Sequence, residues 1–237
     1  MLKSLAAAWQ QIWGYSLPLK SEQEGEPDPV LFVRLLPLAG LALGVVLWLT
    51  AWLSIILIGN YLAGAVVAAI LVPLLYNWLS GGRGLVTASR LGAQLTDGRL
   101  VVSPELQALV AVQICLILQA IAVLILVLTS QSWWLLLMPV LGSTAYAELL
   151  SSRDENGVSA DRLGPVHWYI AGALVLLVTG LQGQLIAGLF ALVLAWLMAP
   201  AVNRFLANRG VEDDADRMRG AFYIAEGLIL WVGVLAA

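Results

Sequence analysis

The chain has 237 residues, of which 61% are hydrophobic and 11% are charged, and its mean hydropathy is +0.90. Soluble domains contain about 25% charged residues, so this composition excludes a soluble globular enzyme and a disordered chain. The net charge of −3 offers no basic surface for nucleic acid. The single cysteine, Cys115, excludes a disulfide framework and a cysteine zinc site. What remains is an all-α polytopic membrane protein whose partner is the lipid bilayer.

Residues 1–30 are predicted to form an interfacial helix followed by a polar linker. Apolar residues recur there at helical spacing, and Trp9 and Trp13 lie on the same face. This stripe favours a helix lying on the membrane over a signal peptide, because no long apolar core precedes a cleavage site. A disordered leader is the alternative. Residues 20–29 are polar, with Pro and Gly, and residues 31–237 form a single predicted transmembrane domain.

The apolar stretches predict a bundle of about seven transmembrane helices, since a helix needs about 20 apolar residues to cross a bilayer. Six spans are the fallback, because the fourth and seventh stretches are less apolar and contain Glu148 and Glu226. Gly40 and Gly44 in the first stretch permit close helix packing. The predicted spans are 36–58, 61–80, 106–129, 132–150, 166–182, 184–201 and 221–237.

Charge placement predicts the orientation of these spans. All 12 basic residues precede the first span or lie in alternate connections. The other connections, 59–60, 130–131 and 182–183, are short and uncharged. The positive-inside rule therefore predicts a cytoplasmic N-terminus and cytoplasmic charged loops, as in a protein of the bacterial inner membrane. Most acids share these loops, so polar chemistry is expected at that face, and the sequence shows no polar path through the membrane for a transported solute.

The charged loops contain short segments of Gly and Arg that predict phosphate binding. Glycines let a phosphate approach the backbone, and a guanidinium can contact it through two hydrogen bonds. A flexible turn at a helix end is the alternative interpretation, and Asp-Gly pairs are also common in turns. The predicted phosphate ligands are Gly81, Gly82, Arg83, Arg90 and Arg99.

Acidic residues gather before the last span. Four carboxylates lie within residues 212–216, and Asp213, Asp214 and Asp216 are candidate oxygen ligands for Mg²⁺. A solvated run of charges flanked by arginines is the alternative. Glu226 follows ten residues after Asp216, inside an apolar span, where an acid is costly and indicates a functional site.

Two further polar residues lie near span ends. Glu148 is close enough to the charged end of the fourth span for its carboxylate to reach the interface. His167, the only histidine, opens the fifth span and is interpreted as an interfacial residue rather than a catalytic base. The chain has no HExxH motif and no nucleotide-binding loop.

Five short segments follow one another in an order typical of one family of membrane enzymes. The segment from Phe32 to Gly44 is similar to a Phe-Pro-x-x-Gly-x-x-x-Gly pattern that opens the first span of that family. The segment from Leu79 to Gly82 is similar to a Gly-Gly pair at the end of its second span. Asp97 to Leu100 resembles Asp-Ser-Arg-Leu-Gly, and Met138 to Leu141 resembles part of a later span. Asp216 to Glu226 resembles a C-terminal Gly-Asp-x-x-Gly-Ala and the acidic helix after it. The family is cobalamin synthase, adenosylcobinamide-GDP ribazoletransferase.

This resemblance implies a Mg²⁺-dependent transferase that joins a ribazole to a nucleotide-activated corrinoid, with GMP leaving. It implies catalytic roles for Asp97, Asp216 and Glu226. The family's acidic Gly-Gly-x-His-x-Asp-Gly-x-Ala-Asp motif is absent, because Gly82 is followed by Arg83 and no acid precedes Asp97 in this loop. Three hypotheses follow: an active transferase, a degenerate relative that acts as a membrane binding or assembly subunit, and an unrelated small transporter or scaffold. The second would assemble with a membrane protein partner or with copies of itself.

Overall fold

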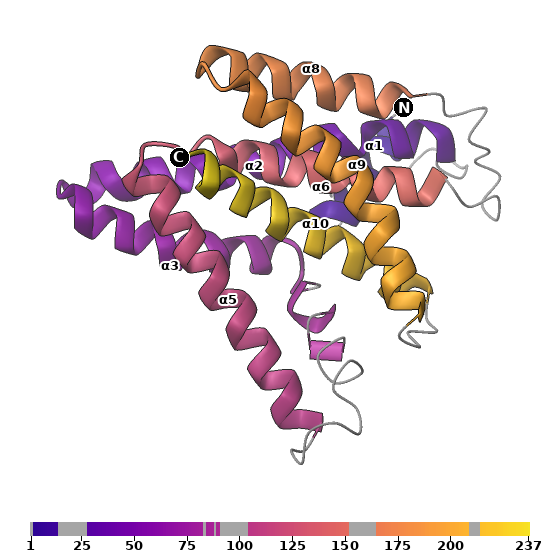
Figure 1. Cartoon of the computed structure of the whole chain (residues 1–237), viewed down its shortest axis with the longest axis horizontal. Coiled ribbons are helices and arrows are strands. Elements are labelled where there is room, and N and C mark those ends of the chain that lie inside the picture. Colours follow the sequence, from indigo (N-terminus) through magenta and orange to yellow (C-terminus); the bar gives the residue numbers. More distant parts are fainter. Residues whose placement is uncertain are drawn as a thin grey trace.

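The structure is a computed structural model in which every regular element of the described residues is a helix (Figure 1). It describes residues 2–13, 28–82, 84–87, 89–90, 104–151, 165–208 and 214–237. The predicted all-α class is therefore confirmed. The principal helices are α1 (Leu2–Trp13), α2 (Pro29–Ile58), α3 (Tyr61–Leu79), α5 (Pro104–Leu128), α6 (Trp134–Ser151), α8 (Val166–Leu181), α9 (Leu185–Asn208) and α10 (Asp214–Ala236).

All seven predicted spans are helices, and six of them are long and apolar enough to cross a membrane. These six are α2, α3, α5, α6, α9 and α10. The remaining span is the shorter apolar helix α8, whose 16 residues rise about 24 Å. The chain is therefore an integral membrane protein with six candidate spans and one shorter apolar helix.

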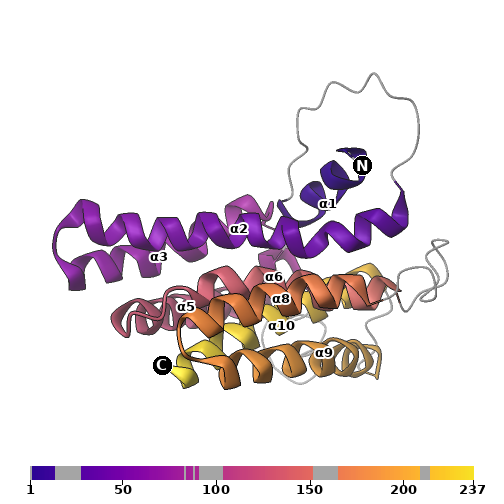
Figure 2. The same ribbon diagram turned by 90° about the horizontal axis from the view of Figure 1, so that it is seen from above.

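The two ends of the bundle differ in what joins the helices. The short turns after α2, α5 and α8 lie at one end together with the C-terminus, which we call the turn end (Figure 2). Gly59 closes α2 there with φ 67°, and the Asn60 side chain accepts a hydrogen bond from the Ala63 amide that opens α3. The helix ends joined by the charged connections, and α1, lie at the opposite end, which we call the charged end. The alternation predicted from the sequence is thus present in space.

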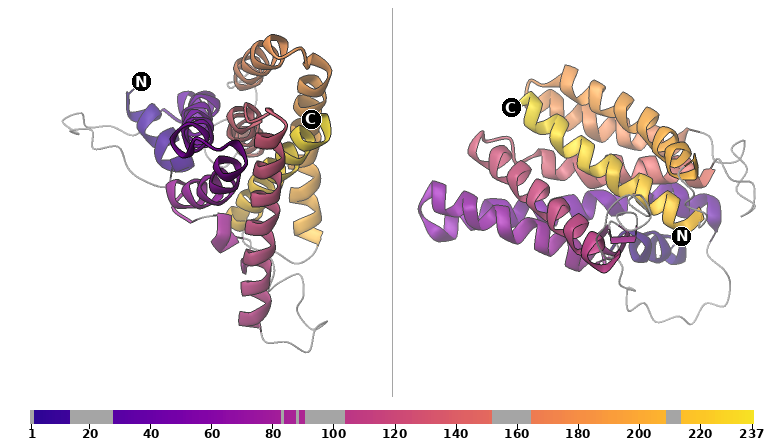
Figure 3. Two further views of the ribbon diagram at one scale, coloured as in Figure 1. Left: turned by 90° about the vertical axis from the view of Figure 1, so that its left-hand side faces the viewer. Right: turned by 60° about the horizontal axis from the view of Figure 1, so that its bottom comes forward.

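α6 lies at the centre of the bundle, where it contacts α2, α8, α9 and α10. Its central polar residues, Ser143 and Thr144, are fully buried, and both hydroxyls donate to the carbonyl oxygen of Val140. Protein rather than lipid therefore surrounds α6, which explains why this span is the least hydrophobic of the six. α5 is less enclosed by protein than α6. It contacts α3 and α10, and the N-terminal part of α5 projects away from the bundle (Figure 3).

Two glycines bring the backbones of α2 and α6 together. A β-carbon built at Gly44 would lie 2.5 Å from the carbonyl oxygen of Leu136, and one built at Gly40 would lie 2.5 Å from the hydroxyl oxygen of Ser143. Real side chains do not occupy such distances. The small-residue spacing seen in the first span is therefore the contact surface for α6.

The N-terminal helix predicted from the sequence is present as α1, and it packs against α2. Ala8, Ile12 and Trp13 are buried, and the Trp13 indole N–H donates to the carbonyl oxygen of Ala39 at 3.2 Å. The rings of Trp9 and Trp13 stack at 4.2 Å. One face of this helix therefore contacts the transmembrane bundle itself.

We expect Gly44→Ala to destabilise the protein by about 1–3 kcal/mol, because the new methyl group must push α2 away from α6. Gly172→Ala is the matched control, since a β-carbon at Gly172 would have no atom within 4 Å. The measurement is unfolding of both variants in detergent micelles. Equal stability of the two variants would show that this helix contact is looser than described.

Candidate functional site

The predicted phosphate and metal ligands are only partly within the described residues. Arg83, Asp97, Arg99 and Asp213 lie outside them. Asp214 and Asp216 lie in the first turn of α10. Arg90 is described and its side chain is exposed.

Gly81 and Gly82 form the turn that ends α3. Both have left-handed backbone angles, with φ 68° and 69°. The Gly81 amide donates to the carbonyl oxygen of Trp78 at 3.0 Å, and the Gly82 amide donates to that of Asn77 at 2.6 Å. Both N–H groups therefore terminate the helix, a use that glycine favours at a C-terminus. The geometry matches the helix-end interpretation of this segment.

Glu226 is separated from the acidic segment by the length of its own helix. Glu226 follows Asp216 by ten positions along α10, which corresponds to a rise of about 15 Å. Ligands of one Mg²⁺ ion lie about 2.1 Å from it, so these two carboxylates cannot share an ion. Within the part of the chain that the structure describes, no group of three or more His, Cys, Asp or Glu residues could hold a metal.

Glu226 lies instead in the interior of the bundle, where it is only 2% exposed. The Tyr76 hydroxyl of α3 donates a hydrogen bond to its Oε2 atom. Its Cγ atom packs directly against Gly142 of α6, where a β-carbon would overlap it. Oε1 has no hydrogen-bond partner among the described residues. Three helices thus hold one carboxyl group that is only half satisfied.

A further set of polar contacts involves Asn77, which follows Tyr76 on α3. The Asn77 amide nitrogen donates to the carbonyl oxygen of Pro73 at 2.8 Å and to Gln119 Oε1 of α5 at 3.2 Å. Asn77 Oδ1 is buried and has no partner among the described residues. The ring of Tyr76 contacts that of Tyr223 edge-on, with centroids 6.5 Å apart. Asn77 and Gln119 interrupt the apolar spans 61–80 and 106–129, and these two interruptions are the only sign of the cluster in the sequence of these spans.

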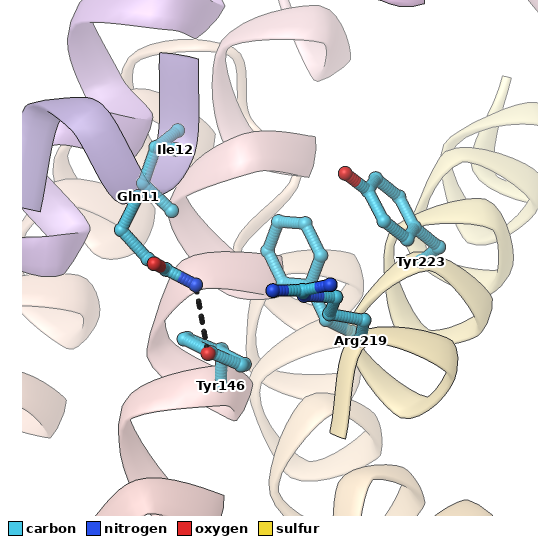
Figure 4. A pocket seen from close by; sticks show the side chains of 6 residues that line it. Gln11, Ile12, Tyr146, Arg219 and Tyr223 are labelled. Atoms are coloured by element: carbon cyan, nitrogen blue, oxygen red, sulfur yellow. Dashed lines mark hydrogen bonds between the residues drawn. The ribbon is translucent and has the colours of Figure 1, made fainter. Parts of the chain in front are cut away.

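A second polar region is a small open pocket at the charged end (Figure 4). The Gln11 amide nitrogen of α1 donates to the Tyr146 hydroxyl of α6 at 2.8 Å. The Arg219 side chain extends from α10 toward these two groups. The pocket is lined by Gln11, Ile12, Tyr146, Arg219, Phe222 and Tyr223. None of these residues was predicted, because their spacing in the sequence does not reveal that α1 meets α6 and α10.

Glu148 and His167 form a third polar contact, between α6 and α8. Glu148 Oε2 accepts a hydrogen bond from the Trp168 indole at 2.8 Å and lies 3.1 Å from His167 Nε2. His167 is 2% exposed, and its Nδ1 atom has no partner among the described residues. This contact joins the N-terminal end of α8 to α6.

Fold and composition together define an integral helical membrane protein. In comparisons with protein families, curated proteins and solved structures, no family model matches the chain, and no protein or structure is significantly similar to it. The resemblance to cobalamin synthase therefore stays a prediction from short segments.

We expect Tyr76→Phe to destabilise the protein by about 1–3 kcal/mol, because it removes the hydrogen bond that Tyr76 donates to the buried Glu226 carboxyl. Tyr169→Phe is the matched control, since Tyr169 is 70% exposed on α8. Free energies of unfolding in detergent micelles compare the two. If both variants retain wild-type stability, the Tyr76 hydrogen bond does not contribute to the fold.

Proposed function

We propose that this protein is a cobalamin-synthase-like membrane protein that binds the phosphate part of a nucleotide-activated corrinoid at the charged end of its bundle. The observation that carries the proposal is the pocket beside Arg219. The ordered resemblance of five segments to cobalamin synthase supports the choice of ligand. The proposed role is that of a binding or assembly subunit.

The chemistry of the pocket suits a phosphate. A guanidinium offers two parallel N–H donors to phosphate oxygens, and Arg219 supplies it from α10. The Gln11 amide and the Tyr146 and Tyr223 hydroxyls line the same pocket and supply neutral polar groups. The donors come from α1, α6 and α10, so the pocket exists only when α1 is docked on the bundle.

We also propose that the charged end faces the cytoplasm of a bacterial cell, with the protein in the inner membrane. The 12 basic residues support this orientation, since none lies in the three short connections at the turn end. A nucleotide-activated ligand in the cytoplasm would then reach the pocket without crossing the membrane.

Phosphoryl-type transfer is the second candidate function. Asp214 and Asp216 begin α10 five and three residues before Arg219, so they lie at the same end of this helix as the pocket. Carboxylates that hold Mg²⁺ beside a bound phosphate are a recurring part of phosphoryl transfer. Asp97, Asp213, Asp214 and Asp216 would be the metal-holding residues, and Glu226 would not take part, because of its separation along α10.

We expect Arg219→Gln to weaken binding of adenosylcobinamide-GDP about tenfold or more, since a charge-assisted hydrogen bond contributes about 1.5–3 kcal/mol. Arg204→Gln is the matched control, because Arg204 is exposed on α9. Equilibrium dialysis against the purified protein in nanodiscs measures binding through the absorbance of the corrinoid. Equal loss in both variants, or no binding by the wild-type protein, would contradict the proposal.

Turnover separates the two candidate functions. If the chain is a transferase, adding α-ribazole and Mg²⁺ to the bound complex releases GMP, and Asp216→Asn lowers the rate by several orders of magnitude while binding persists. Glu105→Gln, which changes an exposed acid in the first turn of α5, should leave the rate unchanged. Binding without GMP release by the wild-type protein would favour the binding subunit.

A further inference from the structure

Glu226 has no positively charged partner among the described residues. It lies in the apolar stretch Met218–Ala236 of α10, with Tyr76, Gly142 and the surrounding apolar side chains as its neighbours. A carboxylate in such a place is an uncompensated charge, which is strongly unfavourable in a low-dielectric interior. Its charge must therefore be balanced by something that is not a side chain of the described residues.

The unsatisfied oxygens show what kind of group is missing. Glu226 Oε1 and Asn77 Oδ1 are both buried and both lack a partner among the described residues. The Asn77 amide nitrogen already donates to Pro73 and Gln119, which fixes Oδ1 as the acceptor end. Because Oε1 of Glu226 accepts from no described donor, this carboxyl group is complete only when it takes up a proton, a water or a cation.

The net charge of the site determines the charge of the ion that it can hold. One carboxylate balances one positive charge, and Tyr76 and Asn77 are neutral. A divalent ion would leave a net positive charge in the membrane interior, and the nearest acids on α10 are about 15 Å away along the helix axis. The site therefore fits a monovalent ion.

A chain of side-chain contacts leads from the charged end to Glu226. Tyr223 lies one helical turn before Glu226 on α10 and lines the open pocket. Its ring contacts Tyr76, and Tyr76 contacts Glu226. A β-carbon built at Gly84 would lie 3.0 Å from the Tyr223 ring and 3.4 Å from Asn77 Oδ1, so this second acceptor lies near the same ring.

We propose that Glu226, with Tyr76, forms a site that takes up one small monovalent cation inside the membrane, either a proton or an alkali ion. This role is separate from ligand binding at Arg219 and does not depend on it. It gives Glu226 a function that the acidic segment at the start of α10 does not share.

Carbodiimide labelling tests the proposal on the full chain in nanodiscs. Dicyclohexylcarbodiimide is apolar, and it adds to a carboxyl group in its protonated form. Peptide mass spectrometry follows labelling of Glu226 in acidic and alkaline buffers that contain choline chloride, NaCl or KCl at equal ionic strength. A proton site is labelled in acidic buffer in every salt, and its labelling falls about tenfold per pH unit at alkaline pH. An alkali-ion site is protected several-fold by NaCl or KCl and not by choline chloride.

The proposal would be overturned by no labelling of Glu226 in any buffer, or by labelling that is independent of both pH and salt. Glu226→Gln must abolish the modification, and persistent label in this variant would assign it to another residue and overturn the proposal as well. Tyr76→Phe keeps the carboxyl group and should change its labelling rate about tenfold, because it removes a hydrogen bond to that group. Tyr169→Phe should leave the rate unchanged. Arg219→Gln should retain labelling, so failure of corrinoid binding and failure of this site are distinguishable.

Discussion

The close contact between α2 and α6 is the constraint on which the rest of the bundle depends. Gly40 and Gly44 let the two backbones touch, and this contact places α6 at the centre. α8, α9 and α10 then pack around α6, while α1 packs on α2. Because every polar site described above includes a residue of one of these helices, a change in the α2–α6 distance would move all of them.

α10 carries charged residues at two positions along its length, and their surroundings differ. Its first turns at the charged end hold Asp214, Asp216 and Arg219. Glu226 lies further along the helix, beside Gly142 and Tyr76, where it is buried within the protein. The rise of an α-helix keeps these positions apart. An interpretation that treats all acids of α10 as one metal site conflicts with this geometry.

The prediction of the candidate site was less complete than that of the fold. Glu226 was singled out correctly as an unusual intramembrane acid, since an isolated acid in an apolar run is visible in the sequence. Its assignment to the same chemistry as Asp216 followed a resemblance between short segments, and the length of α10 argues against it. The sequence allowed two interpretations of Gly81 and Gly82, a phosphate-binding segment and a helix end. In the structure their amides donate to carbonyl oxygens of the last turn of α3.

The sequence by itself determined the membrane class, the positions of seven helices and the segregation of charge to alternate connections. Hydropathy and segment length suffice for these features, because each depends on residues that are close together in the chain. Only the tertiary structure decided that Tyr76 meets Glu226, 150 residues away, and that Gln11 meets Tyr146, 135 residues away. Such contacts depend on which helix faces are adjacent, and a uniformly apolar span has no polar face to indicate its neighbour.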